Sequence, residues 1–150
     1  MELPQLDNLV RIRQLKAESP SQAEMDGLMR SGNARLKDAK NQTLSLDSRF
    51  DLTYNAAHAF SLAALRWHGY RSEHRFTVFQ CLEHTVKLPP EQWRIVDHAH
   101  RKRNIAEYEG YLDIDQSLIE ALIRVAEEVA SRVTSLGPVS VTDGNGTNSG

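Results

Sequence analysis

The stretch FDLTYNAAHAFSLAALRW, residues 50–67, is apolar on almost every side when it is wound into a helix. A helix that is apolar over so wide an arc must be covered by several neighbours. The stretch therefore predicts the central helix of a bundle. Gly69 follows closely, and we expect it to end this helix in the left-handed conformation that glycine adopts without strain.

Amphipathic helices are predicted on both sides of the central one. Ser21-Gln22-Ala23-Glu24 has the form of a capping box, in which a serine and a glutamate satisfy free amides at a helix start. A second cap is expected at Ser45 or Asp47, in the polar turn before the central helix. Phe76 is expected to face inward from the next helix along the chain. The flanking helices are expected over residues 1–17, 21–40, 73–87, 91–110 and 116–136.

These helices define the fold class. No stretch alternates with period two for long enough to suggest a sheet, and short loops favour antiparallel neighbours. The sequence predicts an all-α protein, an antiparallel bundle of five to six helices in one domain over residues 1–137. The Gly/Ser/Asn/Thr-rich tail over residues 138–150 is expected to be disordered.

The composition excludes several classes of function. The 150 residues carry a net charge of −2, so any contact with nucleic acid requires a local patch, and His100-Arg101-Lys102-Arg103 is the only dense basic run. The single Cys81 excludes an intrachain disulfide and is expected to be buried rather than nucleophilic. No apolar run approaches the roughly 18–20 residues of a membrane helix, and no signal peptide is evident. We therefore expect a cytoplasmic protein without membrane contact.

Helix 91–110 breaks its own pattern at one position. Val96, Ala99, Arg103, Ala106 and Gly110 fall on one stripe, and four of the five are small or apolar, which predicts close packing. A guanidinium keeps its charge, so a buried Arg103 needs a carboxylate, a phosphate or another acceptor. A local exception inside a regular helix is often a functional site.

A row of hydrogen-bonding groups lies beside this stripe: Asp97, Arg101, Asn104 and Tyr108. In a binding site, Arg103 anchors a phosphate and Asn104 orients the arginine or contacts a base. Tyr108 then stacks, donates a hydrogen bond or accepts a covalent modification. In the alternative, Arg103 pairs with Glu107 or with an acid from a neighbouring helix and stabilises an interface. The pattern alone does not separate the two interpretations.

Common catalytic motifs are absent from the sequence. The six histidines do not have the spacing of a zinc site, and neither a Gly-rich phosphate loop nor a Gly-x-Ser-x-Gly motif occurs. We expect no metal and no cofactor.

The order of several segments resembles that of HEPN domains, in particular the compact bacterial ones encoded beside a minimal nucleotidyltransferase. The matching segments, within residues 6–136, are Phe50 to Ala57, Gly69-Tyr70-Arg71, the helix with His74, Phe79 and Leu82-Glu83, and Arg101 to Tyr108. The most specific part is Arg101-Lys102-Arg103-Asn104. The resemblance implies a helical bundle that forms a homodimer, with two motifs meeting across a cleft.

Many HEPN proteins are metal-independent ribonucleases whose motif is an arginine followed four to six residues later by a histidine. Here the arginine matches Arg103, the histidine position falls on Tyr108, and no histidine follows His100. A tyrosine with a pKa of about 10 is a poor general base at neutral pH. His100, on the other side of Arg103, is the remaining candidate for a catalytic role.

The leading hypothesis is a dimeric HEPN-type protein with a degenerate, histidine-lacking ribonuclease motif, acting in a toxin–antitoxin or defence-type system. Its groove, with Arg101, Lys102, Arg103 and Asn104, is expected to bind RNA, a nucleotide or a partner nucleotidyltransferase. Such a transferase would silence the protein by attaching AMP to Tyr108 or, alternatively, to Tyr111. One alternative is an active endoribonuclease toxin using Arg103 with Tyr108 or His100. The other is a structural or adaptor bundle without enzymatic activity.

Overall fold

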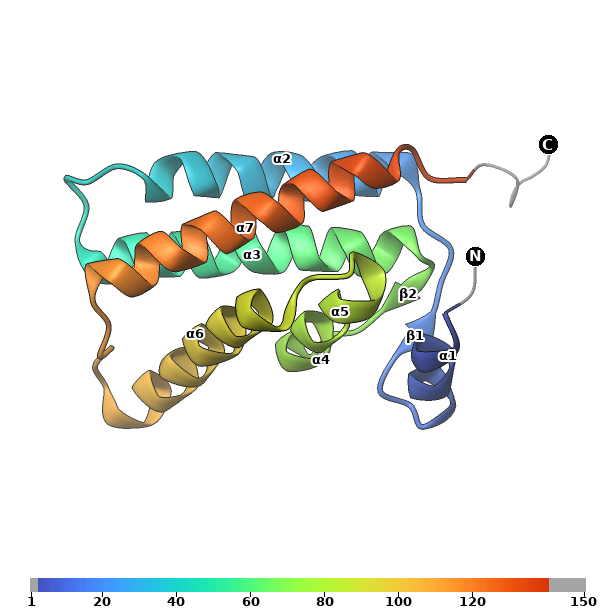
Figure 1. Cartoon of the computed structure of the whole chain (residues 1–150), viewed down its shortest axis with the longest axis horizontal. Coiled ribbons are helices and arrows are strands. Elements are labelled where there is room, and N and C mark those ends of the chain that lie inside the picture. The colour runs from blue at the N-terminus through green and yellow to red at the C-terminus, as the bar shows by residue number, and fades with distance from the viewer. Residues whose placement is uncertain (1–2, 141–150) are drawn as a thin grey trace.

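The computed structural model describes residues 3–140, and within them the chain is mostly helical (Figure 1). The all-α bundle predicted from the sequence is confirmed. The elements in chain order are α1 (Pro4–Arg11), β1 (Lys16–Ala17), α2 (Gln22–Ala39), α3 (Leu46–Trp67), β2 (Tyr70–Arg71), α4 (Arg75–Gln80), α5 (Leu82–Thr85), α6 (Pro90–Glu109) and α7 (Gln116–Leu136).

Helix α3 is the centre of the bundle, as its apolar sequence predicts. It packs along both α2 and α7, and α4 and α5 also contact it, while α6 packs against α7 and α4 (Figure 1). Phe50, Tyr54 and Phe60 from α3 are each no more than 1% exposed. Gly32 of α2 lets the two helices approach closely, since a Cβ atom there would lie 2.4 Å from the Phe60 ring.

Capping follows the predictions in part. The Ser21 hydroxyl accepts a hydrogen bond from the Glu24 amide at 3.1 Å, and the Ser45 hydroxyl caps α3 through the Ser48 amide at 3.1 Å. The other half of the capping box does not form, because the Glu24 carboxylate binds Arg66 instead. Gly69 and Gly110 have the positive φ values expected after α3 and α6.

A two-stranded antiparallel sheet was not predicted. It pairs Lys16 with Arg71 and Ala17 with Tyr70, which is too few residues for an alternating pattern to be visible. The sheet ties α1 to the end of α3. A small second core fills the space between them and α4: Leu6, Leu15, Leu65, Tyr70, Val78 and Cys81.

The single helix predicted over residues 73–87 is wrong, because the chain breaks it at Cys81 into α4 and α5. Cys81 has a ψ of −10°, outside the range of a continuing α-helix. Its side chain lies in the small second core, whereas the adjacent Leu82 lies in the main core. Two consecutive side chains must therefore enter different cores, and the turn at Cys81 allows this.

The packed domain extends past residue 137, where we expected the tail to begin. The Trp67 indole donates a hydrogen bond to the Gly137 carbonyl, and the Val139 amide donates one to Gln22. Val139 itself is 7% exposed. The rest of the expected tail, residues 141–150, lies outside the described residues. Within the described chain, no helix combines the length and the apolar character that crossing a membrane requires.

Candidate anion-binding site

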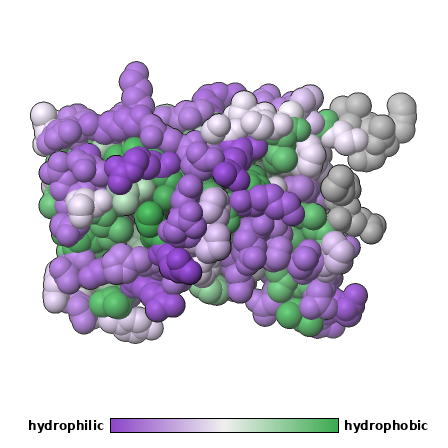
Figure 2. Space-filling view, in the orientation of Figure 1, coloured by the Kyte–Doolittle hydropathy of each residue, from purple (hydrophilic) through white to green (hydrophobic). Residues whose placement is uncertain are grey.

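Only the first half of α6 packs as the sequence predicts. Val96 and Ala99 are buried, but Gly110 is exposed and Ala106 is only partly covered, because the helix diverges from α7 (Figure 1). Figure 2 shows hydrophobic surface between these two helices, on a face that is otherwise mostly hydrophilic. The Arg103 side chain is 32% exposed rather than enclosed. It therefore lies where the packed half of the helix gives way to the solvated half.

Two arginines lie against the same tyrosine ring. The Arg103 guanidinium carbon is 4.9 Å from the centre of the Tyr54 ring, and that of Arg75 is 5.4 Å from it. A guanidinium placed in this way is attracted by the negative face of the ring. Helices α3, α4 and α6 each contribute one side chain to this arrangement. It concentrates two positive charges within one small volume.

The charge of this arginine pair is poorly neutralised. Arg103 contacts Glu107 at 3.5 Å, but the Glu107 side chain is 63% exposed, and such surface pairs contribute only about 0–1 kcal/mol. Among the described residues Arg75 has no carboxylate within ion-pair distance, and its buried Nη1 atom has no hydrogen-bond partner. An unsatisfied donor on a buried charged group is costly. An anion that reached this atom would supply the acceptor that the described residues do not.

His100 connects the arginines to the rest of α6. Its Nδ1 atom is 2.8 Å from the Tyr54 hydroxyl, and its Nε2 atom is 3.2 Å from the Asn104 amide nitrogen. Since an amide nitrogen can only donate, Nε2 accepts in this arrangement, and the neutral ring carries its proton on Nδ1. Nδ1 then donates to the Tyr54 oxygen. The hydroxyl hydrogen of Tyr54 remains available to another acceptor.

The two histidines of the site are held neutral. Burial, and then the charges of Arg75 and Arg103, lower the pKa of His58 to about 4. Burial is also the largest cause that lowers the pKa of His100, with Arg103 next. Burial raises the pKa of Tyr54, although the nearby arginines oppose this. At neutral pH the positive charge of the cluster therefore belongs to its arginines.

The remaining predicted site residues do not join the arginine pair over Tyr54. Tyr108 is 92% exposed, and a separation of five residues places it on a different side of α6 from Arg103. Arg101 pairs with Asp97 at 3.0 Å, and Lys102 pairs with Asp113 at 3.2 Å. Of the predicted residues, the structure thus brings Arg103, His100 and Asn104 together.

Sequence reasoning missed Tyr54, His58 and Arg75 as members of the site. Tyr54 and His58 lie in the most apolar helix, where both resemble core residues. Arg75 precedes Phe76, which we expected to face inward, but Phe76 is 43% exposed. No pattern in the neighbouring sequence indicates that these three side chains lie close to α6.

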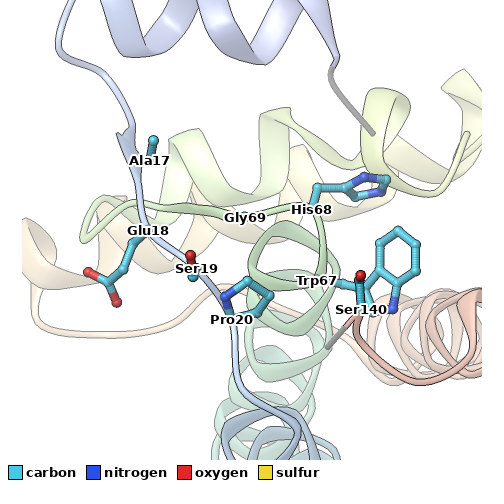
Figure 3. Close-up of a pocket in the computed structure, with 8 residues that line it drawn as sticks. All are labelled: Ala17, Glu18, Ser19, Pro20, Trp67, His68, Gly69 and Ser140. Carbon is cyan, nitrogen blue, oxygen red and sulfur yellow. The ribbon is translucent and has the colours of Figure 1, made fainter. Parts of the chain in front are cut away.

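A separate cavity of about 360 Å³ lies near the other end of α3 (Figure 3). Several of its polar groups are already engaged, although the buried Nδ1 atom of His68 has no hydrogen-bond partner among the described residues. The Glu18 carboxylate, on the opposite side of the cavity from the Trp67 indole, is bound to Arg71. The Glu18 and Ser19 carbonyls accept hydrogen bonds from Arg66. In residues 3–140, no three His, Cys, Asp or Glu side chains gather in a way that could hold a metal ion.

Comparisons with protein-family models, with curated proteins and with solved structures found no match. The function is therefore inferred from the side chains and their geometry.

Proposed function

We propose that this protein binds RNA through the phosphate backbone at the cluster of Arg75, Arg103, His100, Asn104 and Tyr54. The observation that carries the proposal is the arginine pair over Tyr54, which no buried carboxylate of residues 3–140 neutralises. Arginine presents a planar fork of donors that matches phosphate oxygens. The exposed guanidinium of Arg101, one turn from Asn104 on α6, widens the positive surface.

Each residue has a distinct part in this proposal. Arg103 and Arg75 contact phosphate oxygens, and the exposed Asn104 contacts the same ligand beside them. Tyr54 is 1% exposed, so it acts as a floor that positions both arginines and His100. The resemblance to HEPN domains favours RNA over a free nucleotide, and it adds a homodimer in which two such clusters face one ligand.

The test is equilibrium binding of a short fluorescent single-stranded RNA at several salt concentrations. Arg103→Ala is expected to weaken binding roughly 10- to 150-fold, since hydrogen bonds to charged groups contribute about 1.5–3 kcal/mol. Its dependence on salt is expected to fall by about 0.7 in log–log slope for each phosphate contact that is lost. Arg30→Ala is the matched control, because it removes an exposed arginine from α2 on another side of the bundle.

Equal affinities for wild type and Arg103→Ala would contradict the proposal. A protein that binds no RNA, but loses self-association on the same substitution, would instead be the structural or adaptor bundle.

A second candidate function is metal-independent cleavage of RNA. The observation that favours it is the contact between His100 and Tyr54 directly beneath Arg103, which places a neutral imidazole next to the proposed phosphate. A histidine in this state can accept a proton from a ribose hydroxyl. Wild-type protein would cleave total RNA in EDTA, and both His100→Ala and Arg103→Ala would not. Cleavage that survives either substitution would point to a contaminating nuclease.

The proposed nucleotidyltransferase partner, and with it a toxin–antitoxin or defence-type role, is supported by exposure. Tyr108 is 92% exposed and Tyr111 is 64% exposed, so a transferase that attaches AMP can reach both hydroxyls. Tyr108 follows Asn104 by one turn and is the preferred acceptor. Mass spectrometry after co-expression with such a transferase would show one added AMP. The addition would disappear in Tyr108→Phe and persist in Tyr111→Phe.

A further inference from the structure

Phe76 of α4 is an exposed aromatic side chain close to the arginine pair. Phe76 is 43% exposed, whereas the next three residues, Thr77, Val78 and Phe79, are at most 6% exposed. Single exposed hydrophobic residues are common on protein surfaces. Phe76 differs from other exposed hydrophobic residues because it lies close to the arginine pair.

A continuous path of ring contacts joins Phe76 to the arginines. The Phe76 ring centre is 5.8 Å from that of His100, and the His100 ring is 6.1 Å from the Tyr54 ring. Both guanidiniums in turn lie over the Tyr54 ring. Arg75 is also the direct neighbour of Phe76 in the chain. An open apolar ring and a pair of phosphate-binding groups therefore border the same histidine.

We propose that Phe76 is a base-stacking platform, so that the site takes single-stranded RNA with an unpaired base beside the bound phosphate. This inference rests on the proposed function and names the form of RNA that the site selects. Every base has a face that can stack on an aromatic ring, so the preference is for unpaired bases rather than for one sequence. In a duplex the bases are stacked on one another and paired, and a side chain on a shallow surface reaches only the backbone.

Tyr108 is a weaker candidate for the same role. It is almost completely exposed, and no ring contact within the described residues holds it in place. The Phe76 ring is already fixed against His100, so it loses less conformational freedom when a base covers it.

The experiment compares two oligonucleotides of equal length and charge, one single-stranded RNA and one with abasic sugars throughout. Wild type is expected to bind the base-containing strand roughly 5- to 150-fold more tightly, the range measured for aromatic stacking of one base. Phe76→Ala and Phe76→Leu remove this difference, and Phe76→Trp keeps it. Affinity for the abasic strand is expected to be the same in all four proteins.

Two controls accompany these variants. Ile12→Ala removes another exposed apolar side chain, 57% exposed and at the end of α1, and is expected to change neither affinity. A fluorescent adenine analogue placed in the single strand reports stacking directly, since its emission is quenched in wild type and recovers in Phe76→Leu.

The outcomes separate the two proposals. Wild type that binds the abasic strand as tightly as the normal one overturns the stacking platform and leaves phosphate binding intact. The same holds if Phe76→Ala retains the preference for bases. Failure to bind either strand overturns the proposed function together with this inference. A duplex of the same sequence bound as tightly as the single strand also contradicts the platform.

Discussion

Two arginine clusters lie along α3, and they differ in whether the protein itself neutralises them. Arg66 is 1% exposed, and all of its N–H groups are bonded. Its guanidinium binds both Glu24 oxygens at 2.9 and 3.0 Å and the carbonyls of Glu18, Ser19 and Tyr70. Arg75 and Arg103 are less buried, yet among the described residues Arg103 pairs only with the exposed Glu107, Arg75 pairs with no carboxylate, and the buried Nη1 atom of Arg75 has no hydrogen-bond partner.

The comparison shows that burial of an arginine does not by itself indicate a ligand site. Arg66 is the more deeply buried, but its charge and all of its donors are satisfied within the chain, so it joins the segment before α2 to the end of α3. The cluster of Arg75 and Arg103 has charge that the fold does not compensate. A charged group that remains only partly satisfied is the better indicator of a site for an anion.

The largest expected effect on stability comes from breaking the closed cluster, in which Arg66 is bound to Glu24 and to backbone carbonyls. Arg66→Ala removes the donor of three carbonyls and leaves Glu24 with Arg71 as its one remaining arginine partner. Breaking a buried ion pair in this way costs up to about 3–5 kcal/mol. Urea denaturation measures the loss. Arg66→Lys is expected to recover only part of it, because an ammonium group has fewer donors and no planar fork. An Arg66→Ala protein as stable as wild type would show that this cluster does not join the two segments.

The open cluster consists of Arg75 and Arg103 with the nearby His58, and because of His58 the folded protein is expected to lose stability as the solution becomes acidic. His58 has a pKa of about 4 in the folded protein against 6.5 in an unfolded chain, so the unfolded state binds more protons between these values. Stability is therefore full above pH 6.5 and falls by at most roughly 3 kcal/mol as the pH drops towards 4. His58→Gln is expected to flatten denaturation midpoints across this window. An unchanged pH profile would contradict the burial of a neutral His58 beside two arginines.

The closed cluster affects stability at lower pH than His58 does. A measurement of stability against pH can therefore distinguish the two regions. Hydrogen bonding to Arg66 is the largest cause that lowers the pKa of Glu24 below 4.5. Its contribution is therefore present above the unfolded pKa and is lost only as the pH falls through the lower folded value.

The smallest effect on stability is expected in the open cluster itself. Arg103→Ala removes an exposed ion pair and a cation–π contact, which together contribute no more than about 1–2 kcal/mol. The melting temperature should therefore change little, even though RNA affinity falls. A loss of stability as large as that of Arg66→Ala would assign Arg103 a structural role and remove the main support for the site.

The sequence by itself determined the features that depend on neighbouring residues. The apolar arc of α3, the serine caps at Ser21 and Ser45 and the glycine after α6 are set within one or two helical turns, and the structure has them where the pattern predicts. The burial of Cys81, which raises the pKa of its thiol to about 12, also follows from its type. Arg103 was found because it breaks a local pattern, and Asn104 because it lies in the row of hydrogen-bonding groups beside it.

Only the tertiary structure decided which charges are compensated. Glu24 and Arg66 are 42 residues apart, and Tyr54 and His100 are 46 apart, so no helical period relates either pair. The packing of α4 against α3 and α6 goes with the exposure of Phe76 and the approach of Arg75 to Tyr54. Local periodicity fixes which face of a helix is apolar. Which polar groups meet across helices depends on how those faces pack together, and that is a property of the whole chain.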